Sequence, residues 1–260
     1  MGRLLIVSKV DRVEEYLELS REYQTAFEIN DFFEPEVLDD MHLQEHIIEA
    51  YLKKGVPKNS TLHGAFYDVA IFSQDERIRE VSRLRMEQSM KIAKALGTVG
   101  VVFHTNYNPA LSDKIYKENL VQATVEYLKE LLQKYSEISI YLENMFDTTP
   151  EILKNIARKM EGVPSYGVCL DWAHACIYGD KVMDWVRELA TYIKHIHIND
   201  NDLKRDLHLP LGAGAINWQE FVEVYYQYFS HCSVLIETNE PSHQRQSLEF
   251  LKKINLQYDE

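Results

Sequence analysis

The chain has 260 residues, 45% of them hydrophobic, and a formal net charge of −13 at pH 7. That length suits one closed α/β barrel with a large core, while the acidity argues against broad contact with nucleic acid phosphates, which needs clustered Lys and Arg. No apolar run approaches the length of a membrane span, the run LLIV at 4–7 is too short for a signal peptide, and the three cysteines lack zinc-site spacing. We therefore expect a cytoplasmic protein with no membrane partner.

Short apolar runs alternate with amphipathic stretches along the chain, which is the pattern of strands that alternate with helices. The eight predicted strands are Leu4–Ser8, Thr25–Ile29, Ser60–Gly64, Thr98–His104, Ser139–Glu143, Tyr166–Asp171, Ile193–Asn199 and Val234–Glu237. Helical stretches are predicted near 11–22, 37–54, 76–96, 112–135, 149–160, 180–190, 217–230 and 242–254. Ser112, Thr149 and Asn217 are residue types that cap helix starts, and Pro150 suits a first helical turn.

Eight strand–helix repeats without a linker or a charge block predict a single TIM-type (β/α)8 barrel domain over residues 1–260. An open, doubly wound sheet is the alternative, and it would place its site at one switch point fed by few strands. Ionisable residues end the third to the eighth predicted strand, and only a closed ring brings so many strand ends together. In a barrel of this type the site lies at the C-terminal ends of the strands.

Nine residues with metal-binding side chains lie at or just beyond those strand ends. They are His63, His104, Glu143, Asp171, His174, His197, Asp206, His208 and Glu237. Five imidazoles and four carboxylates in one place would repel or desolvate one another unless a cation held them. The pattern therefore predicts a divalent metal centre.

Spacing along the chain indicates different roles for the histidines near the sixth and seventh strands. Asp171 and His174 can face one point if the chain turns where the strand ends, and the alternative is a helix cap at Asp171 with His174 on the surface. His195 and His197 share one face of their strand. Because His197 is nearer the C-terminal end, we interpret it as the ligand and His195 as a core residue that points into the barrel.

The loop after the seventh strand carries Asp206 and His208, which lie two residues apart, so both can reach one ion if the loop is extended. Lys204 and Arg205 beside them could bind a phosphate of a small substrate. The alternative is that both basic residues belong to a solvated loop.

Glu143 and Glu237 each end an apolar strand, at YLE and LIE. A buried carboxylate needs a proton or a partner cation, and the alternative to a metal is a salt bridge to a loop Lys or Arg. Phe66 and Trp172 lie near the predicted mouth of the barrel, where they could cover a substrate or pack in the core.

Several segments resemble the xylose isomerase-like TIM-barrel superfamily: LENMFDTTPEIL, CLDWAHA, IKHIHINDND, RDLHLPLGAGAINW and LIETN. That superfamily includes sugar and sugar phosphate isomerases and epimerases, inositol-catabolic enzymes and endonuclease IV. The resemblance extends from about His63 to Glu237 and implies a metal-dependent (β/α)8 barrel.

Two ligand patterns in that superfamily match this chain. Ketose epimerases hold one manganese-type ion with residues that match Glu143, Asp171, His197 and Glu237, and there the two glutamates also move the substrate proton. Endonuclease IV holds three zinc ions with nine ligands, and all nine residues named above match them. The resemblance implies one to three zinc or manganese ions and leaves two reactions open.

We expect a metal-dependent isomerase or epimerase that acts on a small sugar, polyol or sugar phosphate through an ene-diolate intermediate, with Glu143 and Glu237 as catalytic residues. The first alternative is a multi-zinc phosphodiester hydrolase of the endonuclease IV type, and the second is a metal-binding barrel without turnover. The acidic charge favours a small carbohydrate over nucleic acid as the partner.

Overall fold

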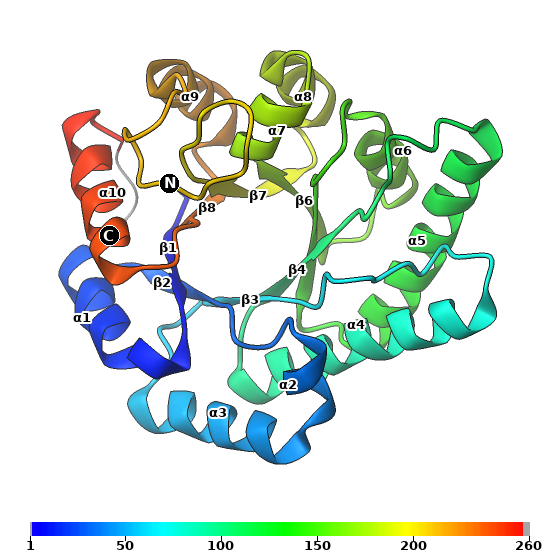
Figure 1. Cartoon of the computed structure of the whole chain (residues 1–260), viewed down its shortest axis with the longest axis horizontal. Helices are drawn as coiled ribbons and strands as arrows, with labels where there is room; N and C mark the ends of the chain where they lie inside the picture. The colour runs from blue at the N-terminus through cyan, green and yellow to red at the C-terminus, as the bar shows by residue number, and fades with distance from the viewer. Residues whose placement is uncertain (1, 257–260) are drawn as a thin grey trace.

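The computed structural model describes residues 2–256, which form a closed barrel of eight parallel strands in chain order (Figure 1). The strands are β1 (Leu4–Ser8), β2 (Ala26–Ile29), β3 (Thr61–His63), β4 (Gly100–His104), β5 (Ser139–Glu143), β6 (Tyr166–Asp171), β7 (Ile193–Ile198) and β8 (Ser233–Ile236). The α-helices are α1 (Val13–Tyr23), α2 (Pro35–Asp39), α3 (Met41–Lys54), α4 (Glu76–Leu96), α5 (Lys114–Lys134), α6 (Glu151–Lys159), α7 (Trp172–Tyr178), α8 (Val182–Leu189), α9 (Trp218–Val224) and α10 (Pro241–Lys253). The helices surround the strands as an outer ring. The closed ring confirms the predicted (β/α)8 fold and excludes the doubly wound alternative.

The strands are buried on both faces, which explains why they read as nearly continuous apolar runs. One face packs against the helices in the main hydrophobic core. On the other face, Leu5, Val7, Ala26 and Leu235 form a separate apolar cluster. Leu5 is the register partner of both Ala26 and Leu235, so this cluster fills the interior between β8, β1 and β2. The barrel interior is therefore packed and is not a pore.

The helices differ from the sequence prediction in three places. The stretch 37–54 is two helices, because the chain is extended at Asp40, whose side chain caps α3. The stretch 217–230 is α9 followed by a π-helical turn, Tyr225–Phe229. Helix α7 is absent from the predicted elements, because it follows β6 directly and no loop residues separate the two.

The predicted helix starts agree with the structure in part. Asn217 caps α9 through its side chain, as expected. Helix α5 is capped by Asp113, one residue after the predicted Ser112, and a carboxylate at this position also interacts favourably with the helix dipole. Pro150 directly precedes α6.

No helix within residues 2–256 is long and apolar enough to cross a membrane. Helices α4 and α5 have 21 residues each, and both carry charged side chains along their length.

Candidate metal centre and substrate cavity

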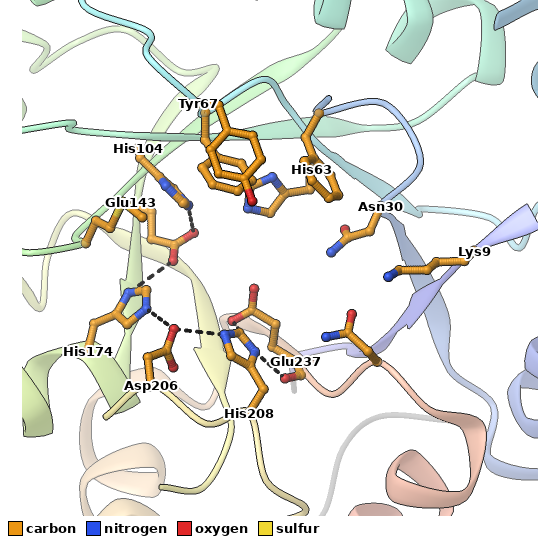
Figure 2. A pocket seen from close by; sticks show the side chains of 14 residues that line it. Lys9, Asn30, His63, Tyr67, His104, Glu143, His174, Asp206, His208 and Glu237 are labelled. Atoms are coloured by element: carbon orange, nitrogen blue, oxygen red, sulfur yellow. Dashed lines mark hydrogen bonds and ion pairs between the residues drawn. The ribbon is translucent and has the colours of Figure 1, made fainter. Parts of the chain in front are cut away.

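A cavity of about 280 Å³ opens at the C-terminal ends of the strands (Figure 2). Its lining residues within the described chain are Lys9, Asn30, Phe33, His63, Phe66, Tyr67, His104, Glu143, Met145, His174, Asp206, His208, Glu237 and Asn239. Seven of the nine predicted metal ligands are among them, and the other two, Asp171 and His197, are fully buried beside it. The structure therefore brings all nine to one end of the barrel.

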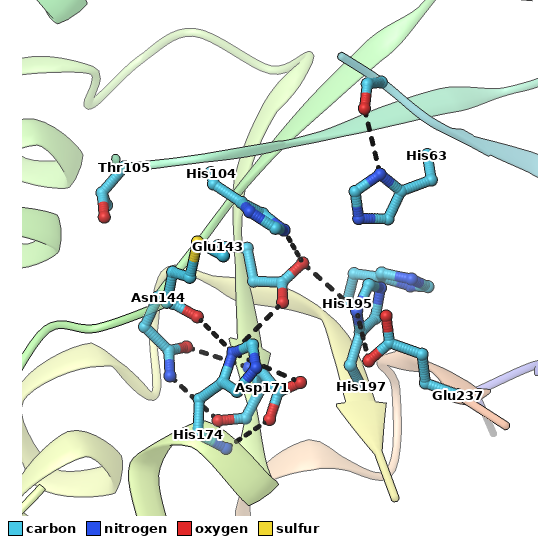
Figure 3. Close-up of polar contacts among 12 residues, drawn as sticks. His63, His104, Thr105, Glu143, Asn144, Asp171, His174, His195, His197 and Glu237 are labelled. Carbon is cyan, nitrogen blue, oxygen red and sulfur yellow. Dashed lines mark hydrogen bonds and ion pairs between the residues drawn. The ribbon is translucent and has the colours of Figure 1, made fainter. Parts of the chain in front are cut away.

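Four of these residues form what we call the central group: Glu143, Asp171, His197 and Glu237. One ligand atom from each lies within 4.8 Å of the others. The Nδ1 atom of His197 is 3.2 Å from Glu143 Oε2 and 3.6 Å from Glu237 Oε2 (Figure 3). Three of the four are strand residues of β5, β6 and β7, and Glu237 directly follows β8. Donor atoms this close could share one ion.

His63, His104 and Glu143 form the β3–β5 group, in which one ligand atom from each again lies within 4.8 Å of the others. His104 is the register partner of Glu143 on the neighbouring strand, and its Nε2 atom lies 3.5 Å from Glu143 Oε2. Glu143 belongs to both groups, and its Oε2 atom makes the contacts with both His104 and His197. Its carboxylate could therefore serve an ion in either group.

His174, Asp206 and His208 form the rim group. Asp206 Oδ2 lies 2.9 Å from His208 Nε2 and 3.3 Å from His174 Nε2. The side chains of Asp206 and His208 are 27% and 28% exposed, whereas His174 is buried. This group therefore lies nearer to solvent than the central group.

Main-chain carbonyls orient three of the predicted ligand histidines. The Nδ1 atoms of His63, His174 and His208 lie 3.0, 2.9 and 2.9 Å from carbonyl oxygens, to which a protonated Nδ1 donates. In the neutral ring, the lone pair is then on Nε2, and for His174 and His208 this atom faces Asp206. A histidine that binds a metal through Nε2 requires this tautomer.

Asp171 is held at the junction of β6 and α7. Its Oδ1 accepts a hydrogen bond of 2.6 Å from the backbone N–H of His174 and so caps α7. The side-chain amide of Asn144 forms two hydrogen bonds of 2.9 Å with the main chain of Asp171. The helix-cap interpretation of Asp171 is therefore correct, but His174 is buried and not on the surface.

The ionisable groups perturb one another strongly. Burial raises the pKa of Glu143, but His197 and His104 outweigh burial and lower that pKa well below its usual value. Burial, together with the carboxylates of Glu237 and Glu143, raises the pKa of Asp171 to about 8. Protons therefore neutralise part of the cluster in the metal-free protein, and a cation that binds there would displace them.

The donor set fits a divalent cation. Within residues 2–256, hydrogen-bond partners are lacking for both carboxylate oxygens of Glu143, both ring nitrogens of His197 and His104, and one oxygen each of Asp171 and Glu237. A buried polar atom without a partner costs roughly 1–3 kcal/mol, so this concentration of unpaired atoms favours a bound ion. Mixed imidazole and carboxylate donors suit zinc or manganese.

Glu28 on β2 belongs to the site although the sequence prediction did not include it. Its carboxylate is fully buried and lies 3.2 Å from His197 Nε2 and 3.3 Å from His195 Nε2, and it accepts a 2.8 Å hydrogen bond from Thr61 Oγ1. Burial raises the pKa of Glu28, but the two imidazoles outweigh it and lower that pKa far below its usual value. The signal in the sequence is a lone acid inside the otherwise apolar strand AFEI.

The aromatic wall of the cavity consists of Phe33, Phe66 and Tyr67. The ring of Phe66 lies 4.1 Å from that of Tyr67 and 5.2 Å from that of Phe33 between centroids. Phe66, one of the predicted substrate-binding residues, therefore lies where a ligand in the cavity would contact it.

The other three predicted substrate-binding residues lie elsewhere. Trp172 is 1% exposed, and its ring packs against Phe221 in the hydrophobic core. Lys204 and Arg205 are exposed on the loop after β7, outside the lining of the cavity, and Arg205 pairs with Asp202 at 2.8 Å. Trp172 thus has the core position, and Lys204 and Arg205 the solvated-loop position, that the sequence left open as alternatives.

The loop that carries Asp206 and His208 is built around the buried carboxylate of Asp200. This carboxylate accepts hydrogen bonds from three backbone N–H groups of the loop at 2.9, 2.9 and 3.2 Å and from Trp218 Nε1 at 2.8 Å. Gly212 has a φ of 80°, and a Cβ atom there would meet an aromatic ring of α10 at 2.4 Å. Glycine at this position therefore permits the tight turn that brings the rim group over the barrel.

The fold and the ligand groups define a (β/α)8 barrel with a candidate metal centre at its C-terminal end. The family model of the xylose isomerase-like TIM barrel matches residues 25–254, and the chain belongs to this family. This membership confirms the resemblance inferred from the sequence motifs.

Two related proteins carry different descriptions. A probable endonuclease 4 of Aquifex aeolicus is 24% identical over 200 residues, which are 70% of this chain and 71% of that protein. An uncharacterized protein of Methanocaldococcus jannaschii is 27% identical over 164 residues. That match covers 62% of this chain and 63% of the relative, so the chain spans less than two thirds of the relative's length.

Solved structures share the whole fold. A D-tagatose 3-epimerase-like protein superposes with a TM-score of 0.77 at 25% identity, and the match covers 97% of each chain. A Thermus thermophilus protein, from a crystal soaked with ZnCl2, superposes with a TM-score of 0.75 at 22% identity over 96% of this chain and 97% of that one. D-psicose 3-epimerase of Clostridium cellulolyticum, solved with D-tagatose, gives 0.71 at 16% identity over 98% of each chain.

Proposed function

We propose that the protein is a metal-dependent isomerase or epimerase that acts on a small sugar, polyol or sugar phosphate. The observation that carries this proposal is the central group. Glu143 and Glu237 reach the same cavity from different strands, and their carboxylates meet Asp171 and His197 within 4.8 Å. Two carboxylates on one small cavity are what proton removal and return at a substrate carbon require.

A divalent ion bound to the central group would stabilise the negative charge that develops on neighbouring substrate oxygens. The residues of the chain then supply the proton transfer. One of Glu143 and Glu237 removes the proton from the carbon beside the carbonyl, which leaves an ene-diolate, and the other returns a proton. Burial raises the pKa of Glu143, but His197 and His104 hold it well below its usual value, so the carboxylate is ionised and can accept a proton.

The shape of the cavity supports a small substrate. A volume of about 280 Å³ is near the lower limit of ligand pockets. Phe33, Phe66 and Tyr67 offer an aromatic wall against which the apolar face of a sugar can pack. The similarity to a D-tagatose 3-epimerase-like protein at 25% identity supports the same substrate class.

The second candidate is a phosphodiester hydrolase of the endonuclease IV type. Two observations favour it. All nine residues that match the endonuclease IV ligands lie at one end of the barrel, and the chain is similar to a probable endonuclease 4. Four ligand carboxylates against three divalent ions would leave a local charge near +2, which suits a phosphate. The net charge of −13 opposes it, because the surface repels a duplex.

One experiment separates the two reactions and the third possibility, a metal-binding barrel without turnover. The same zinc- or manganese-loaded preparation is assayed in D2O on a panel of ketoses, polyols and sugar phosphates and, at low and moderate salt, on duplex DNA with an abasic site. We expect a carbon-bound proton of one sugar to exchange with solvent, and Glu143→Gln or Glu237→Gln to reduce that rate by a factor of about 100 or more. Glu223→Gln, on the exposed face of α9, is the matched control. Strand cleavage that Glu237→Gln abolishes, without activity on any sugar, would establish the hydrolase instead.

A further inference from the structure

One wall of the cavity consists of hydrogen-bond donors that belong to none of the ligand groups. Lys9 and Asn30 directly follow β1 and β2, and Asn239 lies three residues after the end of β8. These strands are neighbours in the barrel, since β1 pairs with both β2 and β8. Figure 2 shows Lys9 and Asn30 across the cavity from His104 and Glu143. The donor wall, as we call Lys9, Asn30 and Asn239, therefore faces the catalytic candidates.

The main chain of the donor wall is anchored, while its side chains are unpaired. The backbone N–H of Asn30 donates to the carbonyl of Ser8 at 3.0 Å, and the carbonyl of Asn239 accepts from the hydroxyl of Tyr16 at 2.6 Å. The carbonyl of Lys9 accepts from the 3-10 turn after β1 at 3.3 Å. Within residues 2–256, by contrast, the Lys9 ammonium and the two side-chain amides make no hydrogen bond or ion pair. A fixed backbone with unpaired donors is an arrangement suited to a ligand.

The neighbouring acid does not neutralise Lys9 by contact. Asp31 Oδ1 accepts a hydrogen bond of 3.0 Å from the backbone N–H of Val10, and its Oδ2 accepts one of 2.6 Å from the hydroxyl of Tyr51. Among the described lining residues, Lys9 is the one lysine or arginine. The cavity is thus polarised, with a positive donor wall on one side and carboxylates on the other.

We propose that the donor wall binds the anionic group, a phosphate or a carboxylate, of a sugar whose reacting carbons lie beside Glu143 and Glu237. An ammonium group and two amide NH2 groups match the several acceptor oxygens of such an anion. The sugar part of this inference rests on the proposed function, and the anion part rests on the donor wall alone. The substrate class is therefore a phosphorylated or acidic small sugar, bound at Lys9 and not at the exposed Lys204 and Arg205.

The test compares three compounds of one carbon skeleton: D-fructose, D-fructose 6-phosphate and D-fructuronate. Their binding to the metal-loaded protein is measured by calorimetry for the wild type and for Lys9→Gln. Charge-assisted hydrogen bonds are strong, so Lys9→Gln should lower the affinity for the more tightly bound anionic compound by a factor of roughly 10–100. The affinity for D-fructose should fall by less than about twofold. The tighter anionic compound identifies phosphate or carboxylate as the preferred group.

Three further variants make the result specific. Lys9→Arg keeps the charge and should retain most of the affinity for the anionic compound. Lys58→Gln removes an exposed positive charge away from the cavity and should leave binding at the wild-type level. The double variant Lys204→Gln with Arg205→Gln tests the loop after β7. If this double variant binds the anionic compound more weakly than the wild type while Lys9→Gln does not, the proposal is overturned. Failure of the wild type to bind either anionic compound more tightly than D-fructose would also overturn it.

Proton exchange in D2O separates this inference from the proposed function. If Lys9→Gln weakens binding of an anionic sugar but no sugar exchanges a carbon-bound proton, the anion site stands and the isomerase proposal fails. If D-fructose and its phosphate exchange a carbon-bound proton with equal kcat/KM, and Lys9→Gln changes neither value, the isomerase proposal stands and the anion site fails.

Discussion

A buried carboxylate beside an imidazole fixes both the orientation and the tautomer of the ring. Glu28 is an ion-pair neighbour of His197, 3.2 Å from Nε2 on the side of the ring that faces away from the central group, and a proton on Nε2 would face it. The ring can then present Nδ1 to Glu143 and Glu237. We therefore expect Glu28 to act on the metal centre through His197, as a positioning residue.

Replacing this carboxylate should weaken metal binding without unfolding the barrel. Glu28→Gln keeps the side-chain size but removes the charge that orients His197, so we expect metal affinity to fall by a factor of about 10–100. Competition with a fluorescent chelator measures this change, and circular dichroism checks the fold. Ser233→Ala is the matched control, because it removes the 2.6 Å contact with His195 and leaves His197 untouched. Equal affinities in Glu28→Gln and the wild type would show that Glu28 has no such role.

Asp147 is a buried acid just outside the ligand groups, in the loop after β5. Its Oδ2 accepts hydrogen bonds from Thr105 Oγ1 at 2.6 Å and from the backbone N–H of Met145 at 3.1 Å, while its Oδ1 has no partner within residues 2–256. Burial raises the pKa of Asp147 from 3.8 to about 6, although the hydrogen bond from Thr105 lowers it in part. The native protein thus binds this proton more tightly than the unfolded chain does.

This preference gives the free energy of unfolding a defined pH dependence. A carboxyl group with a raised folded-state pKa contributes stability that is present below the unfolded pKa and is lost as the pH rises through the folded pKa. Relative to Asp147→Asn, which has no charge to titrate, the wild type should lose about 2–3 kcal/mol more between about pH 4 and about pH 7. Urea unfolding of the two chelator-treated proteins at several pH values measures the difference. Parallel pH profiles would contradict the prediction.

At the scale of elements, strand ends are the part of the site that the sequence reveals. A buried parallel strand reads as an apolar run, so an ionisable residue that stops the run, as in VVFH or IYLE, marks the C-terminal end where a barrel carries its site. Glu28 lies inside its strand and not at the end, so the same pattern does not find it.

Other features depend on contacts between distant segments. Asp171 both ends β6 and caps α7, so no loop residues signal the new helix. The burial of Trp172 follows from packing against Phe221, and the exposure of Lys204 follows from how its loop folds. The choice of ring nitrogen in His174 and His208 is set by carbonyl groups that only the tertiary structure places.

The loop after β7 should lose its order when its central carboxylate is removed. Asp200→Ala leaves three backbone N–H groups and the Trp218 indole without an acceptor, and each unsatisfied buried donor costs about 1–3 kcal/mol. We expect the free energy of unfolding to fall by at least this amount and the metal bound at Asp206 and His208 to be lost. Urea unfolding and elemental analysis measure the two effects.

The matched control on the same loop is Asp202→Ala. Asp202 pairs with Arg205 and accepts hydrogen bonds from the backbone N–H groups of Lys204 and Arg205. Because these contacts lie on the surface, water can replace them and they add little to stability. Its removal should leave metal content unchanged. If Asp200→Ala and Asp202→Ala retained the same metal content, the loop would not depend on the buried carboxylate for its order.

At the scale of the whole molecule, the acidity and the metal centre are linked. The chain carries a net charge of −13, and ten of its residues are histidines, of which five are predicted ligands. Like charges that lie close together destabilise the compact state. Divalent ions that bound the native barrel and not the unfolded chain would offset this repulsion where the carboxylates are most concentrated, and they would stabilise the fold by mass action.

Removal of these ions should therefore lower the melting temperature, and their number should report which groups bind. At a free ion concentration of about 100 times Kd, binding contributes about 2.7 kcal/mol, which for a protein of this size corresponds to a shift of roughly 5–11 °C at about 2–4 °C per kcal/mol.

Nine donor residues exceed the roughly four to six that one such ion accepts, so we expect at least two ions per chain by elemental analysis of protein purified without chelator. His63→Ala should remove the ion of the β3–β5 group and leave the central ion, whereas His42→Ala, exposed on α3, should remove none. One ion in the wild type and in both variants would assign His63 and His104 to substrate contact or packing.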